Sequence, residues 1–166
     1  MATFVSGKMD ELWLLLEAVK DPEVPAISVV ELGVVRDIKG TQEHPEIVIT
    51  PTYSGCPAMK EIEDDIIAEL TRNGFEQVKV TTVLSPAWTT DWITEEGKRK
   101  LKEFGIAPPE ETTADKNFIM GIEKVISCPH CNGKNTIMKS QFGSTACKAL
   151  HFCNDCQEPF DYFKCL

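Results

Sequence analysis

The sequence lacks the features that mark several large classes of protein. Its longest apolar runs, such as LWLLL at 12–16, are far shorter than the ~20 residues that cross a bilayer. The first residues, MATFVSGKMDELW, contain no basic stretch followed by an apolar run, so we expect no secretory signal. There is no glycine-rich phosphate loop and no HExxH motif. We therefore expect a cytoplasmic protein that has no membrane contact.

Basic residues are also scarce. The chain has 17 Lys and Arg against 26 Asp and Glu, for a net charge of −9. Residues 122–166 carry five lysines against four acidic residues, so the acidic excess lies in residues 1–121. Binding along a phosphate backbone needs clustered cations. The composition therefore argues against nucleic acid as a main partner.

Histidine is rare as well, with three in the chain. In the first two thirds only His44 occurs, in a polar turn, so a Cys–His nucleophile pair is not expected there. We find no complete catalytic constellation. The sequence favours an accessory factor without catalytic activity of its own.

The apolar periodicity predicts an α+β domain. Met9, Leu12, Leu16 and Val19 follow a helical spacing, which the prolines of DPEVP end. The segments expected in order are a helix at 8–19, a hairpin of strands at 33–40 and 46–51, a helix at 58–73, a strand at 77–84, and a helix from Thr94 to Gly105. This order predicts a two-layer helix/sheet sandwich with a small mixed sheet.

The composition changes near residue 107. We assign 1–107 to the α+β domain, 108–121 to a proline- and charge-rich linker, and 122–166 to a small β module. The last segment holds six of the seven cysteines and is too short to fold on a hydrophobic core alone. A bound metal ion is the expected substitute for that core.

Two CxxC pairs, Cys128/Cys131 and Cys153/Cys156, predict a structural metal site. Four thiolates satisfy tetrahedral zinc and leave no open position. Disulfides are the alternative, which a reducing compartment disfavours, and four thiolates also suit iron or an iron–sulfur cluster. Two further residue sets stay open: His130 or His151 as replacement ligands, and Cys147 with Cys165 either as buried thiols or as an accessory metal site.

Cys56 is the one cysteine outside this module, in the stretch TYSGCPAMKEI. Pro57 suits the first turn of a helix, which places Cys56 at or next to the N-cap. The helix dipole there favours a thiolate and so predicts a lowered pKa. With partial exposure to solvent, such a cysteine is a candidate nucleophile or metal ligand. The alternative is a buried capping cysteine that only packs. Pocket candidates around it are Asp21, Thr89, Thr90 and Asp91, although the composition favours turn and cap chemistry for these residues.

Several long motifs carry a resemblance. The stretches DPEVPAISVVELGVVRDI, PTYSGCPAMKEIEDDI and LSPAWTTDWITEEGKRKLKEFGIAPP resemble the domain of SufT-like iron–sulfur assembly proteins. With SCPHC and QFGSTACKALHFCNDCQEPFDYFKC added, nearly the whole chain resembles the PaaD family, the accessory proteins of the phenylacetyl-CoA ring-epoxidising oxygenase.

That resemblance implies an iron–sulfur-assembly-type domain followed by a zinc ribbon, and a place in aerobic phenylacetate catabolism. It implies maturation of the oxygenase, with Cys56 as the functional thiol that transiently holds iron or an iron–sulfur cluster. The implied partners are the oxygenase and reductase subunits, and a homo-oligomer is a further possibility. A structural or tethering subunit of the oxygenase is the alternative role.

Overall fold

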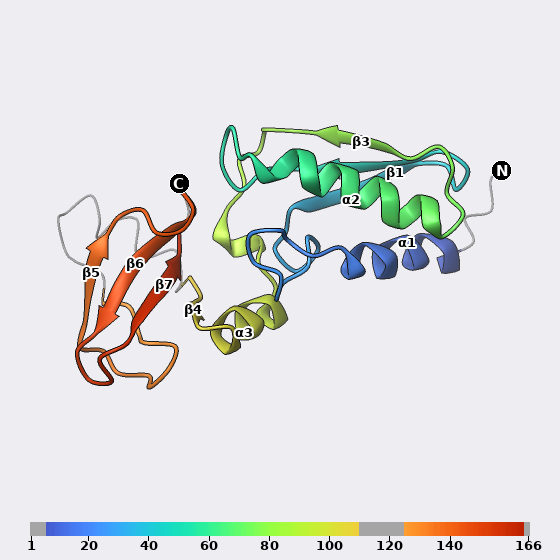
Figure 1. Ribbon diagram of the computed structural model, residues 1–166. Helices are drawn as coiled ribbons and strands as arrows, with labels where there is room; N and C mark the ends of the chain where they lie inside the picture. The colour runs from blue at the N-terminus through green and yellow to red at the C-terminus, as the bar shows by residue number, and fades with distance from the viewer. Residues whose placement is uncertain (1–5, 110–124, 165–166) are drawn as a thin grey trace. The chain divides into compact units, whose positions relative to one another are not determined.

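The computed structural model describes residues 6–109 and 125–164. The chain divides into two compact units, one ending at Trp88 and the other beginning at Thr89. Each unit is drawn in Figure 1. Among the described residues, no helix is both long and apolar enough to span a membrane.

The first unit is a two-layer α+β sandwich, as the sequence predicts. Two helices, α1 (Ser6–Ala18) and α2 (Ala58–Arg72), contact each other and lie on one face of a three-stranded sheet (Figure 1). The strands are β1 (Val35–Gly40), β2 (Pro45–Ile49) and β3 (Lys79–Thr82), in the order β1-β2-β3. β1 and β2 form an antiparallel hairpin, whereas β2 and β3 are parallel because α2 provides the crossover between them.

Helical spacing explains the core of this unit. Leu12 and Leu16 on α1 are fully buried, and Ile66 and Leu70 on α2 are buried in the same way one turn apart. The sheet adds Ile47 and Ile49 from β2, which are also fully buried. Burial of these side chains fixes the helices on the sheet and thereby fixes the loop that joins β2 to α2.

The second unit contains the helical turn η1 (Thr90–Trp92), helix α3 (Glu95–Glu103) and a four-stranded sheet. The strands are β4 (Ile106–Ala107), β5 (Thr136–Ser140), β6 (Lys148–Cys153) and β7 (Pro159–Phe163), in the order β4-β7-β6-β5. β6 pairs antiparallel with both β5 and β7. Thr94 caps α3 as expected, since its hydroxyl accepts a hydrogen bond from the N–H of Gly97 at 3.0 Å.

The boundary between the two units lies between Trp88 and Thr89. The sequence assignment of 1–107, 108–121 and 122–166 has no boundary there. Residues 89–107 group with the second unit, because Ile106 and Ala107 pair in parallel with Asp161 and Tyr162 of β7. Local sequence gives no sign of such a long-range pairing. Most of the expected linker, from residue 110, lies outside the described residues.

Candidate functional site

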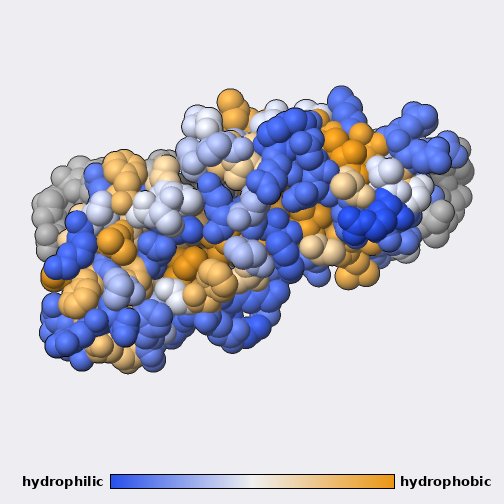
Figure 2. Space-filling view, viewed as in Figure 1, coloured by the Kyte–Doolittle hydropathy of each residue, from blue (hydrophilic) through white to orange (hydrophobic). Residues whose placement is uncertain are grey.

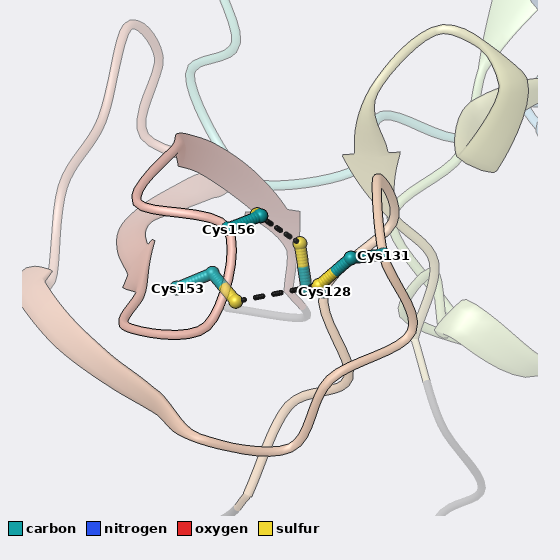
Figure 3. Close-up of side chains that lie close together, drawn as sticks. All are labelled: Cys128, Cys131, Cys153 and Cys156. Carbon is teal, nitrogen blue, oxygen red and sulfur yellow. Dashed lines mark hydrogen bonds between the residues drawn. The ribbon is translucent and has the colours of Figure 1, made fainter.

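Four cysteine sulfurs converge in the second unit (Figure 3). The Sγ atoms of Cys128, Cys131, Cys153 and Cys156 all lie within 4.8 Å of one another. The Sγ atoms of Cys128 and Cys156 are 3.7 Å apart, and those of Cys131 and Cys153 are 3.6 Å apart. Among the residues that the structure describes, no other group of Cys, His, Asp or Glu brings three ligand atoms so close together.

Both CxxC loops are built in the same way. The N–H of Cys128 donates to the carbonyl of Gly133, and the N–H of Cys153 donates to the carbonyl of Glu158, in each case five residues on. The residue after each second cysteine, Asn132 or Gln157, has φ of +60°. The left-handed residue turns the chain back, so that both sulfurs of a pair point to the same side.

Backbone N–H groups also point at the sulfurs. Gly133 donates to Cys131 Sγ at 3.3 Å, and Glu158 donates in the same way to Cys156 Sγ. A Cβ at position 133 would lie 2.4 Å from a carboxylate oxygen of Asp155 and 3.1 Å from Cys131 Sγ, so a side chain there would displace at least the Asp155 carboxylate. Such donors stabilise thiolate sulfur.

The quartet fits a zinc ion. A tetrahedral site with Zn–S bonds of about 2.3 Å has sulfurs roughly 3.8 Å apart. The Cys128–Cys156 and Cys131–Cys153 separations of 3.7 and 3.6 Å are close to this value. Hydrogen bonds from the N–H groups of Cys156 and Asp155 lower the pKa of Cys153 to about 7, whereas burial, together with the neighbouring thiols, raises the pKa of Cys156 to about 12. A divalent cation makes four adjacent thiolates favourable.

The other metal-ligand candidates lie elsewhere in this unit. The His130 ring lies over Gly105, at 3.1 Å from the position that a Cβ would take there. His151 is buried and stacks on Phe160, with ring centroids 5.6 Å apart. Neither histidine joins the quartet.

Cys147 is buried at the start of β6, with its Sγ 3.1 Å from the hydroxyl of Thr145. Cys165 lies outside the described residues. An accessory metal site that uses both residues stays a prediction.

Cys56 lies in the first unit, in the loop that joins β2 to α2. Pro57 is the N-cap of α2, so Cys56 directly precedes the helix. The N–H of Ala58 and the hydroxyl of Tyr53 donate to Cys56 Sγ. The side chain is 9% exposed, which is less open than the sequence suggested but not sealed from solvent.

The expected lowering of the Cys56 pKa is wrong. Burial raises the pKa of the thiol, and the carboxylates of Glu23 and Asp21 raise it further. The two hydrogen bonds to the sulfur oppose this shift but do not outweigh it. Cys56 is therefore a protonated thiol at neutral pH when no cation is bound, because desolvation and two nearby negative charges disfavour the thiolate.

Alkylation by iodoacetamide tests this environment. We expect the rate at Cys56, followed by mass spectrometry of the peptide, to rise with an apparent pKa above the ordinary value of 9.0. Asp21→Asn should lower that apparent pKa, because the amide oxygen still accepts the turn's hydrogen bonds while the charge is lost. Cys56→Ser supplies the background. An apparent pKa below 9.0 in the wild type would contradict the assignment.

Of the predicted pocket residues, Asp21 lies close enough to act on the charge of Cys56. Its Oδ1 accepts hydrogen bonds from the N–H groups of Glu23 at 2.9 Å and Val24 at 2.8 Å, which holds the DPEV turn. Thr89, Thr90 and Asp91 belong to the second unit, where Thr89 caps η1 by accepting from the N–H of Asp91 at 3.2 Å. Their part in a Cys56 pocket stays a prediction.

Sequence reasoning missed two residues at this site. Glu23 adds the second carboxylate, and Tyr53 adds a hydroxyl donor to the sulfur. Both were visible in the quoted motifs, Glu23 in DPEVP and Tyr53 three residues before Cys56. Nothing in the sequence shows that the two motifs meet in space.

Known proteins match both units. Residues 10–84 match the family described as iron–sulfur cluster assembly protein, and residues 112–164 match the PaaD zinc beta ribbon domain. A DUF59 domain structure from Bacillus anthracis is 30% identical, with a TM-score of 0.52, over 55% of this chain and 89% of that one. Protein TM0487 from Thermotoga maritima is 26% identical, with a TM-score of 0.48, over 61% of this chain and 98% of that one.

The fold and the cysteine quartet thus define a protein with an iron–sulfur-assembly-type domain followed by a zinc ribbon. A protein of Escherichia coli strain K12 that is named as a putative subunit of 1,2-phenylacetyl-CoA epoxidase is 43% identical over 166 residues, which is 100% of this chain and 98% of that protein. The chain belongs to the PaaD family. The resemblance drawn from its motifs is confirmed.

Proposed function

We propose that this protein is a maturation factor for the phenylacetyl-CoA ring-epoxidising oxygenase, and that it assists assembly of an iron or iron–sulfur centre. Two findings support the proposal: the relative's name as a subunit of that epoxidase, and the match of residues 10–84 to iron–sulfur cluster assembly proteins. The observation that carries it is the placement of Cys56 beside two carboxylates in that domain.

Cys56 is the residue that receives the cargo. Iron is a substrate here, and it binds the sulfur only when the proton leaves. The raised pKa makes the empty site a thiol, and the negative charges of Asp21 and Glu23 favour an incoming cation. Proton return then helps release, so the site holds its cargo reversibly.

The quartet has a different role. Cys128, Cys131, Cys153 and Cys156 would hold a zinc ion, which adds folding energy to the core cluster of Ala107, Ile126 and Phe160 around the buried cysteines. Four protein ligands leave no position for substrate. Zinc therefore stabilises the module, and the transient chemistry belongs to Cys56.

Cys56→Ser tests the proposal. We expect the variant to fold normally, while oxygenase co-produced with it contains about tenfold less iron, measured by elemental analysis, and is correspondingly less active. Cys147→Ser is the matched control, because it removes another buried thiol outside the quartet. A fully metallated oxygenase in the Cys56→Ser background would refute the role.

A tethering subunit is the second candidate, because the relative is named as a subunit. In that case the protein would copurify with the oxygenase in fixed stoichiometry, and Cys56→Ser would have no effect on iron content. Size-exclusion chromatography of the co-produced proteins distinguishes the two roles.

A further inference from the structure

The hairpin of β5 and β6 differs in charge from the rest of the protein. Residues 132–152 contain three lysines and no Asp or Glu, whereas the whole chain has a net charge of −9. Lys134 and Lys139 of this set are exposed, and Lys148 is buried. An otherwise acidic protein therefore presents one locally basic hairpin.

The same hairpin exposes large apolar side chains. Ile137 is 42% exposed, Met138 55% and Phe142 60%. Figure 2 shows hydrophobic residues interspersed with hydrophilic ones over this sheet. Exposed apolar side chains gathered on one short hairpin are typical of a contact surface, whereas single ones scattered over a protein are ordinary.

Lysine and aromatic side chains lie close together at two places on this hairpin. Ile137 of β5 is directly opposite Phe152 of β6, and Lys139 Nζ lies 5.3 Å from the centroid of the Phe152 ring. In the loop between β5 and β6, the Phe142 ring has its centroid 4.2 Å from Nζ of Lys164, a residue that follows β7 and also donates to the carbonyl of Gln141. Each cation covers an aromatic ring and leaves N–H donors for an acceptor.

We propose that this hairpin surface, formed by Ile137, Lys139, Phe142 and Phe152, docks an acidic segment of a partner protein that also carries apolar side chains. The apolar residues of the segment would bury Ile137 and Phe152, and its carboxylates would pair with Lys139 and Lys164. The charge of the chain supports this choice, because its net charge of −9 repels an acidic partner overall, whereas the lysines at this hairpin attract it. The proposal does not depend on the function of Cys56.

A labelled peptide of about twelve residues, in which Asp and Glu alternate with Leu and Val, tests the surface by fluorescence anisotropy with the full-length protein. Two comparison peptides replace the acidic residues by Lys or the apolar residues by Ser. We expect the acidic apolar peptide to bind about tenfold more tightly than either. Rising salt should weaken its binding.

Charge and apolar variants locate the site. Lys139→Glu and Ile137→Ser should each weaken binding about fivefold or more, and Lys139→Glu should improve binding of the Lys peptide. Lys102→Glu, at an exposed lysine of α3, and Leu14→Ser, at a leucine that is 67% exposed, are the matched controls and should stay within about twofold of the wild type. All four positions are exposed enough that the variants should fold.

Three results would overturn the proposal. The first is equal affinity for the acidic apolar peptide and the Ser-substituted peptide. The second is an equal loss of affinity for the acidic apolar peptide in the Lys139→Glu and Lys102→Glu variants. The third is tight binding of an oligo(dT) strand that Lys139→Glu abolishes, without binding of the acidic peptide. That outcome would make the hairpin a nucleic-acid surface instead.

Discussion

Replacing Cys153 by serine is expected to remove zinc from the protein and to unfold the sheet of the second unit. Cys153 is fully buried and its Sγ lies 3.6 Å from that of Cys131, so a hydroxyl there leaves three thiolates around the ion. The core cluster around the quartet contains Ala107, Ile126 and Phe160 besides the buried cysteines Cys128 and Cys153. We therefore expect metal binding to supply a large part of the folding free energy, which is on the order of 10 kcal/mol in comparable small zinc modules.

Metal analysis and limited proteolysis of the full chain measure this effect. We expect less than about one tenth of the wild-type zinc content, with rapid cleavage in 125–164 and a protected 6–88 segment. Cys147→Ser, which leaves the quartet intact, should retain zinc. A protease-resistant second unit in the zinc-free Cys153→Ser protein would show that the metal is not what holds it together.

Leu16→Ala should strongly destabilise the first unit. Leu16 of α1 is fully buried, so its truncation removes apolar contacts and leaves a cavity beneath the helix. Such changes cost about 2–5 kcal/mol of the free energy of unfolding. Thermal denaturation should show a fall in Tm of roughly 10–20 °C for a unit of this size.

Leu14→Ala is the matched control, two residues away on the same helix. Leu14 is 67% exposed, so the same truncation removes little buried area and should change stability by less than about 0.5 kcal/mol. Equal destabilisation by the two variants would contradict the orientation of α1 described above.

The sequence predicted the elements of the first unit well, because their signals are local. The spacing of Leu12, Leu16 and Val19 and the prolines after them defined α1, and two β-rich runs around a polar turn defined the β1–β2 hairpin. No strand at Ile106 and Ala107 was predicted from the sequence. Their pairing with β7 joins residues more than fifty positions apart, and no local pattern encodes it.

The same contrast between local and long-range signals separates the metal centre from the thiol site. The two CxxC spacings were enough to predict the quartet. Each spacing places two sulfurs side by side, and one zinc ion can bind both pairs. The character of Cys56 depended on the tertiary structure. The helix terminus beside it favours a thiolate, but folding buries the sulfur and brings Asp21 and Glu23 from more than thirty residues away. Desolvation and charge repulsion then outweigh the local dipole, and the thiol keeps its proton.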